Sequence, residues 1–313
     1  MMRKETALPS HFGRRDDRNE VQISDVKAFC GATTARAREK RMEEFSNLFG
    51  STNASPQDFE AVADALRLVM RLEQIFDRAV VTADDLREAG VGTRPAWDDE
   101  VEVFVPVALF NLERAPWNYL ELFAFGIHDE APVVFEGRDL PGHYDPIGRT
   151  FGGLGTGTRT VDGFYIHAND DQVVEGLYLS PLEAFDLADP IGPRHALGTL
   201  INALMNAHLH NVHLRFECLA DDQRDRLRLW TRNGLEGLWW CLADGIRRGV
   251  EFSSCEWCGA PFPGRGLQRA QAGRFCCDAH RQTAGEHPGH TLTTWNEEKA
   301  TRKAARKGEE TQG

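Results

Sequence analysis

The chain has 313 residues, of which 41% are hydrophobic, and its formal net charge is −12 at pH 7. This length and apolar content allow one large domain or two, with a sizeable buried core. The acidic balance excludes a protein whose whole surface attracts nucleic acid, because contacts with phosphate need a basic face. No run approaches the roughly 18 apolar residues of a membrane span, and no apolar leader is present, so we expect a cytoplasmic protein without a membrane association. The seven cysteines, an odd number clustered at metal-binding spacing, fit that reducing compartment.

The first part of the chain is expected to be helical after a polar start. Residues 1–33 are polar and charge-mixed without a sustained period, and we expect a disordered arm there. Good helix formers predict a helix over residues 35–49. A second helix is expected to begin at Pro56, which suits the first helical position, and apolar residues then recur at three- and four-residue steps. Thr82 begins a further short helical turn that Gly90 ends.

Short β-branched and aromatic runs replace the helical pattern after residue 100. They predict an antiparallel meander of about five strands between residues 100 and 180. These strands are expected over residues 101–110, 119–127, 131–137, 163–169 and 173–180. Polar residues 169–171 separate the last two at hairpin length. The glycine-rich segment at 149–158 lacks the lysine and the following helix of a phosphate-binding loop, so we interpret it as a hairpin loop.

Three helices are predicted between the sheet and the cysteines. A Ser-x-x-Glu capping-box spacing predicts a helix over residues 180–188. Apolar periodicity predicts a longer helix over 193–208. The clearest pattern predicts a long helix over 221–248, which carries Trp239 and Trp240 in its second half. We interpret both tryptophans as packing residues and not as platforms on which bases stack.

Four cysteines and a histidine stand between residues 255 and 280. Cys255 and Cys258 form a Cys-x2-Cys pair, which aims two thiolates at one ion. Cys276 and His280 follow at a spacing that closes a tetrahedral shell, and a short helix would place both on one face. Cys277 is the alternative third cysteine, because it would also meet His280 at a three-residue step. The pattern predicts one structural Zn2+ of the Cys3His type and gives no sign of the open position that a catalytic zinc needs.

These residues resemble a known kind of zinc module. The runs CEWCG at 255–259, RFC at 274–276 and HRQ at 280–282 are similar to a treble-clef or ribbon-like zinc finger of the CGNR type, which ends many bacterial proteins. The CGNR tetrapeptide itself and the dense basic run after the last ligand are absent from this sequence. The resemblance covers about 30 residues and implies zinc binding and a nucleic-acid role. It places the ligands at Cys255, Cys258, Cys276 and His280.

The sequence therefore predicts an α+β protein with N-terminal helices, a central antiparallel β-meander, a long helix and a small C-terminal zinc finger. Its expected parts are a disordered arm, an α+β domain, a zinc-finger module and a mixed-charge helical tail, at residues 1–33, 34–250, 251–290 and 291–313. The first functional hypothesis is a zinc-binding regulator that contacts DNA or RNA through a local patch of four arginines. They are Arg265, Arg269, Arg274 and Arg281. The alternative is an interaction protein whose zinc module is only structural or docks a protein partner.

A third hypothesis places an enzyme of unknown class in region 100–215. Three histidines are available there as acid–base groups, namely His128, His143 and His167. The His-x-His-x-x-His run at 208–213 suggests a second metal site, but no carboxylate stands close to it. We interpret that run as solvated or hydrogen-bonded histidines at the end of an element. The sequence has no motif for a nucleophile or a nucleotide-binding loop, so the binding hypotheses come first.

Overall fold

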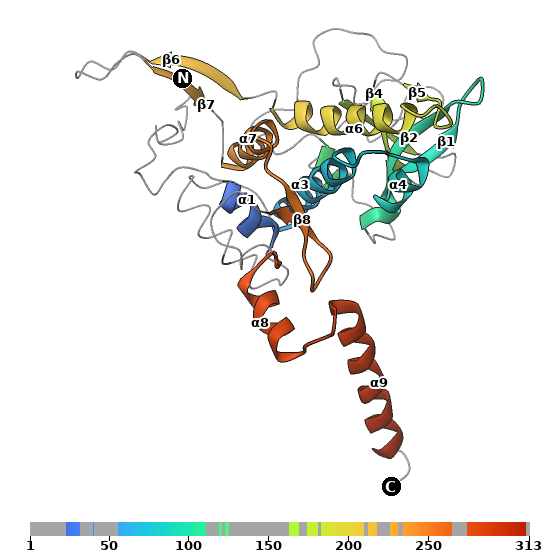
Figure 1. The fold of residues 1–313 in the computed structure, drawn as a ribbon, viewed down its shortest axis with the longest axis vertical. Helices are drawn as coiled ribbons and strands as arrows, with labels where there is room; N and C mark the ends of the chain where they lie inside the picture. Colours follow the sequence, from blue (N-terminus) through green and yellow to red (C-terminus); the bar gives the residue numbers. More distant parts are fainter. Residues whose placement is uncertain are drawn as a thin grey trace, which may run out of the picture.

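A computed structural model describes the chain in segments, and the fold below refers to these residues alone. They are residues 23–31, 40, 56–110, 119–120, 123–124, 163–168, 174–180, 183–209, 212–217, 226–230, 234–264 and 274–310. Helices and antiparallel sheets occur together in them, which is the α+β class that the sequence predicts. Figure 1 shows a body of helices with one main sheet, from which the C-terminal helix projects. None of the helices in these segments combines the length and the apolar composition that a membrane crossing requires.

The main sheet lies at one end of the body (Figure 1) and is antiparallel throughout. Its strands are β1 (Gly92–Pro95), β2 (Val101–Pro106), β3 (Gly163–Ala168), β4 (Val174–Ser180) and β5 (Ala184–Phe185). The order is β1-β2-β4-β3, and β5 pairs with the start of β2. β3 and β4 are neighbours, as the predicted hairpin requires. Phe104 of β2 lies opposite Tyr178 of β4, and the two rings stack with their centroids 4.6 Å apart.

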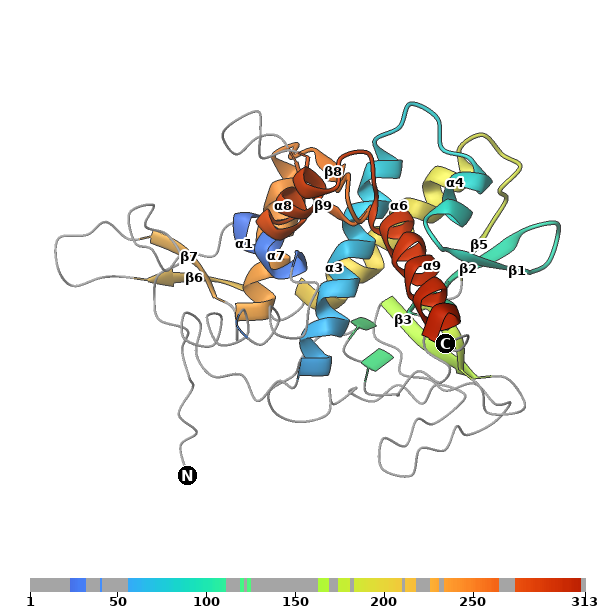
Figure 2. The same cartoon turned by 90° about the horizontal axis from the view of Figure 1, so that it is seen from below.

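α3 (Pro56–Phe76) is the central helix of the body (Figure 2), and it begins at Pro56, as the sequence predicts. Its residues Leu66, Val69, Met70 and Leu72 are completely buried. α3 is in contact with α1 (Ile23–Cys30), α6 (Gly192–Leu209) and α7 (Gly234–Arg247). α6 confirms the helix predicted over residues 193–208. One continuous hydrophobic core joins these four helices to the sheet.

The remaining elements are shorter or more peripheral. They are α4 (Ala83–Glu88), the 3-10 helix η1 (Val107–Phe110), β6 (His213–Glu217), β7 (Arg226–Trp230), β8 (Phe252–Ser254), β9 (Pro261–Pro263), α8 (Asp278–Glu286) and α9 (Leu292–Glu310). β6 pairs with β7, and β8 pairs with β9, each in a separate two-stranded sheet. The short turn predicted from Thr82 is α4, and α9 supplies the helix expected near the end of the chain.

Residues 23–30, which fall inside the arm predicted as disordered, form helix α1 instead. Val26, Phe29 and Cys30 are buried in the main core, and the ring of Phe29 lies 5.8 Å from that of Phe59 in α3. Arg67 of α3 donates two hydrogen bonds to the carbonyl oxygen of Cys30, at 2.5 and 3.1 Å. The prediction of a disordered arm was wrong for these residues because the apolar face of α1 is short. Its helix is held by partners on α3 that the local sequence does not reveal.

The long helix predicted over 221–248 is wrong for residues 226–230, which form β7. Leucines alternate with arginines in this stretch, and a period of two suits a strand. β7 pairs with β6 in a register that places Leu229 opposite Leu214. The helix itself starts only at Gly234, as α7. The three-residue step from Leu227 to Trp230 also fits a helix, so the spacing of apolar residues alone does not decide between a helix and a strand here.

The strand predicted over 119–127 is also wrong where it can be compared, because residues 119–120 and 123–124 are helical. Tyr119, Leu120, Phe123 and Ala124 are all buried. This spacing of buried residues is typical of one helix face and not of a strand.

The helix predicted over 180–188 is replaced in part by β5. Ala184 and Phe185 pair with the first residues of β2, so the sheet edge supplies hydrogen bonds that compete with the capping box. The predictions over 35–49, 131–137 and 149–158 lie outside the described residues, apart from Lys40, which is helical.

Candidate metal centre

The first half of the candidate centre is the turn that connects β8 to β9. The amide of Gly259 donates to the carbonyl oxygen of Cys255 at 2.7 Å, and the amide of Cys255 donates to that of Ala260 at 2.9 Å. Gly259 has a φ of +73°, in the left-handed region that a residue without a Cβ adopts readily. The closed turn directs the side chains of Cys255 and Cys258 to one place.

The second half lies at the start of α8. Cys277 is the N-cap residue of this helix, with an extended φ of −151°, so Cys276 precedes the helix and His280 lies in its first turn. The four-residue step between Cys276 and His280 predicts that both lie on one helix face. They do meet, with the Nδ1 atom of His280 3.0 Å from the Sγ atom of Cys276, but across the helix start. Cys277, the alternative third cysteine, is not in the set of four residues whose ligand atoms all lie within 4.8 Å of one another, although its side chain approaches Cys276 and His280.

The ligand atoms of Cys255, Cys258, Cys276 and His280 all lie within 4.8 Å of one another. The Sγ atoms of Cys258 and Cys276 are 3.8 Å apart, and the Nδ1 atom of His280 is 3.7 Å from the Sγ atom of Cys255. Two ligand atoms bound to one tetrahedral Zn2+ lie about 3.5–3.8 Å apart, given bond lengths of about 2.0–2.3 Å. The spacing of these atoms therefore fits one Zn2+ ion after small adjustments.

The centre is buried, and its chemistry suits a borderline-soft ion. Cys255, Cys276 and His280 are at most 7% exposed, whereas Cys258 is half-buried. Hydrogen bonds with Cys258 and Cys276 lower the pKa of the Cys255 thiol, which favours its thiolate. Hydrogen bonds with Cys255 and Cys258 raise the pKa of His280 to about 12. A proton on the imidazole thus balances thiolate charge, and a metal ion that takes this place would release it.

A small apolar cluster supports the centre. Its buried members are Cys255, Trp257, Phe262 and Cys276. Trp295 of α9 packs against this cluster, and His287 stacks on Trp295 with the ring centroids 3.7 Å apart. The amide of Leu292 also donates to the carbonyl oxygen of Trp257 at 2.7 Å. The start of α9 is therefore bound to the metal-binding segment.

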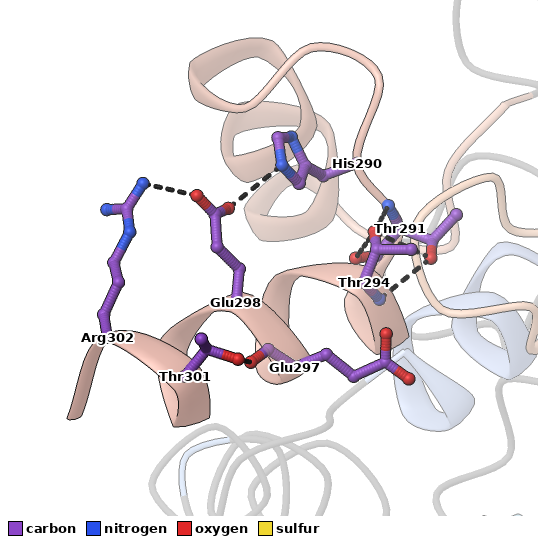
Figure 3. A network of polar contacts seen from close by, with 7 residues as sticks. All are labelled: His290, Thr291, Thr294, Glu297, Glu298, Thr301 and Arg302. Atoms are coloured by element: carbon purple, nitrogen blue, oxygen red, sulfur yellow. Dashed lines mark hydrogen bonds and ion pairs between the residues drawn. The ribbon is translucent and has the colours of Figure 1, made fainter. Parts of the chain in front are cut away.

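The polar contacts in Figure 3 fix the start of α9. Thr291 and Thr294 cap the helix reciprocally, with each amide donating to the other hydroxyl at 2.8 and 3.4 Å. Glu298 accepts from Arg302 at 2.5 Å, and its other oxygen lies 3.1 Å from the Nε2 atom of His290. These contacts brace the first turns of the helix, while its residues from 299 to 303 are exposed.

Two of the four arginines predicted to contact nucleic acid lie beside carboxylates. Arg274 is 2.5 Å from Glu256, and Arg281 is 3.1 Å from Asp278. Arg265 and Arg269 lie outside the described residues. The positive charge of the two arginines that can be placed is thus partly neutralised by neighbours within the same module.

The histidines considered for other roles fall in different places. His208 is buried, its Nε2 atom lies 2.9 Å from the carbonyl oxygen of Phe123, and its ring stacks on Trp239 at 3.9 Å. The interpretations of His208 as hydrogen-bonded and of Trp239 as a packing residue are confirmed. His167 is on β3, whereas His128 and His143 lie outside the described residues.

Comparison with family models, curated proteins and solved structures finds no match to this chain. The likeness to CGNR-type zinc fingers therefore stays an expectation from the sequence, and the structure shows a cluster of three cysteines and one histidine that could hold a metal ion. Lys27 and Gly31 of the N-terminal segment also lie beside the centre, although nothing in their local sequence marks them as part of a metal site.

Proposed function

We propose that this chain is a zinc-binding protein that holds one structural Zn2+. The ligands are Cys255, Cys258, Cys276 and His280. The observation that carries the proposal is the approach of their four ligand atoms to within 4.8 Å of one another. Four protein ligands complete a tetrahedral shell, which is typical of structural and not of catalytic zinc. A reducing compartment such as the cytoplasm would keep the three thiolates available.

The ion's role, in this proposal, is to hold the C-terminal module in the shape that docks on the rest of the protein. Among the described residues of the module, the apolar cluster is small, so metal binding would supply much of the folding free energy. β9 contacts both α1 and α3, and Phe262 of β9 is completely buried. The side-chain amide of Gln74 lies 3.5 Å from the hydroxyl of Ser254 across the same interface. These contacts favour a docked structural element.

Nucleic-acid binding is the second candidate function. It is supported by the likeness to zinc fingers and by the exposure of Arg274 and Arg281, whose side chains are 66% and 60% exposed. Against it, each of these arginines has a carboxylate neighbour, and the chain as a whole carries a net charge of −12. A phosphate would have to displace Glu256 or Asp278 to gain a full charge-assisted contact.

Metal content and nucleic-acid binding are measured on the purified full chain. We expect elemental analysis to find one zinc per chain, and a chain prepared without chelators that holds no metal would contradict the zinc proposal. DNA and RNA are then titrated at several salt concentrations against the wild type and a variant with glutamine at Arg265, Arg269, Arg274 and Arg281. A docked structural module predicts equal, weak binding by both. A salt slope that falls by roughly one for each lost arginine would instead support nucleic-acid recognition.

A further inference from the structure

Helix α1, from the opposite end of the chain, lies directly against the candidate metal centre. α1 lies near α8 in Figures 1 and 2, and it contacts β9 of the metal module. A close approach occurs at Gly31, which follows the last turn of α1. A Cβ atom added to Gly31 would lie 2.9 Å from the carbonyl oxygen of Cys276 and 3.3 Å from the Cβ atom of Cys277. Only a residue without a side chain therefore lets α1 approach the loop that carries Cys276.

Lys27 brings a positive charge to the same place. It is one turn before Gly31, whose amide donates to the Lys27 carbonyl oxygen at 2.9 Å. The Nζ atom of Lys27 lies 4.6 Å from the centre of the Phe262 ring, which belongs to the apolar cluster of the metal module. Burial lowers the pKa of Lys27, while the negative charges of Cys276 and Asp278 oppose that decrease. Lys27 therefore brings a positive charge to the apolar cluster beside the candidate ligands.

A polar network holds the end of α1 in this position. Arg67 of α3 donates to the carbonyl oxygen of Cys30 and to the carboxylate of Asp64, the latter at 2.6 Å. The hydroxyl of Tyr119 donates to the other oxygen of Asp64 at 2.6 Å. The end of α1 is therefore held by α3, and Gly31, which follows it, meets Cys276.

We propose that Lys27 and Gly31 are positioning residues of the zinc centre, so that zinc binding and docking of α1 stabilise each other. The proposal rests on the proposed function, since it needs an ion bound by three thiolates and one imidazole. Three thiolates outweigh the two positive charges of Zn2+ by one, and a nearby ammonium group offsets that excess. Gly31 allows the close contact that brings this charge into place. Because the coupling is reciprocal, removal of zinc loosens α1, and a poorly docked α1 weakens zinc binding.

Substitutions at Lys27 test the charge. The zinc dissociation constant is measured by competition with a chromophoric chelator for wild type, Lys27→Gln, Lys27→Arg and the control Lys303→Gln on exposed α9. We expect Lys27→Gln to weaken zinc binding about tenfold, which is the lower end of the loss seen when a residue next to the metal ligands is replaced. Lys27→Arg is expected to restore most of the affinity. Cobalt-substituted Lys27→Gln keeps the tetrahedral absorption of the wild type, because its ligands are unchanged. Equal zinc affinity in Lys27→Gln and Lys303→Gln would overturn the role of Lys27.

Gly31 and the coupling are tested on the full chain by hydrogen exchange. In the wild type, we expect the amides of residues 23–31 to lose at least about tenfold in protection when zinc is chelated, while those of α6 change little. Gly31→Ala is expected to cause part of this loss with zinc present. Gly285→Ala, where an added Cβ meets nothing within 4 Å, is the matched control. Protection of residues 23–31 that does not respond to chelation would overturn the coupling.

The two proposals fail in different ways. A wild-type chain without bound zinc overturns the zinc proposal, and this inference falls with it. A chain that holds one zinc, but in which Lys27→Gln and Gly31→Ala behave like their controls, overturns only the role of α1.

Discussion

The Sγ atoms of Cys258 and Cys276 lie 3.8 Å apart, although the two residues are 18 positions apart in the sequence. This separation equals the distance of about 3.8 Å between two thiolates bound to one tetrahedral Zn2+. One cysteine comes from the turn after β8 and the other from the segment before α8. A single ion at this point would therefore join two segments that also meet in the small apolar cluster of Trp257 and Phe262.

The choice between the two neighbouring cysteines can be tested directly. We expect Cys276→Ser to lose most of its bound zinc, because it removes one of the four converging ligand atoms. Cys277→Ser should keep about one zinc per chain, since Cys277 caps α8 through its backbone conformation and serine is a favourable N-cap residue. Zinc content of the two purified variants, measured by elemental analysis, decides the matter. Equal loss in both would contradict the assignment.

His208 is expected to stabilise the fold without binding metal. Replacing it by alanine removes the stacking on Trp239 and leaves the buried carbonyl oxygen of Phe123 without its donor. We expect His208→Ala to lower the free energy of unfolding by about 2–4 kcal/mol, measured by urea denaturation. His195→Ala, at an exposed position of α6, is the control and should change stability by less than about 1 kcal/mol. Loss of zinc in His208→Ala without a loss of stability would contradict this role.

Glu73 of α3 makes stability depend on pH. It is only 8% exposed, and burial, together with the charge of Asp77, raises its pKa to about 7. The folded state therefore favours the protonated carboxyl. Its contribution is complete below the unfolded pKa of about 4.5 and is lost as the pH rises through about 7. We expect Glu73→Gln to be more stable than the wild type at pH 8 by up to about 3 kcal/mol.

The measurement for Glu73 is urea denaturation between pH 5 and pH 8, a range chosen to bracket its transition at about pH 7. The difference between Glu73→Gln and the wild type should shrink as the pH falls. Glu297→Gln, at an exposed position of α9, is the control and should follow the wild type at every pH. A pH-independent difference for Glu73→Gln would indicate a packing effect and contradict the titration.

Thr82 caps α4 through a reciprocal pair of hydrogen bonds. Its hydroxyl accepts from the amide of Asp85 at 3.3 Å, and the carboxylate of Asp85 accepts from the amide of Thr82 at 2.8 Å. We expect Thr82→Ala to lower the melting temperature by about 2 °C and Thr82→Ser to change it little. Hydrogen bonds from Thr82 lower the pKa of Asp85, so this stabilisation is present at neutral pH and is lost in acid. Calorimetry at neutral and acid pH tests both statements.

Local sequence signals were enough to predict several parts of this protein. The Cys-x2-Cys pair and the later cysteine and histidine specify a metal-binding set, because ligand chemistry and short spacing are written directly in the chain. The start of α3 at Pro56 and the extent of α6 also follow from residues within each helix. In each of these cases, the decisive interaction lies within the element or a few residues from it.

Contacts between residues far apart in the sequence decided the remaining features of the fold and the site. Cys276 and Cys277 both stand at helical spacing from His280, and only the path of the chain before α8 brings Cys276 to the other ligands. Residues 226–230 fit two periods, and pairing with β6 makes them a strand. α1 becomes a helix beside the metal centre because α3 and the Cys276 loop hold it there. The sequence by itself determined which side chains are able to bind a metal, and tertiary structure decided which of them meet and what lies beside them, because those contacts join segments far apart in the chain.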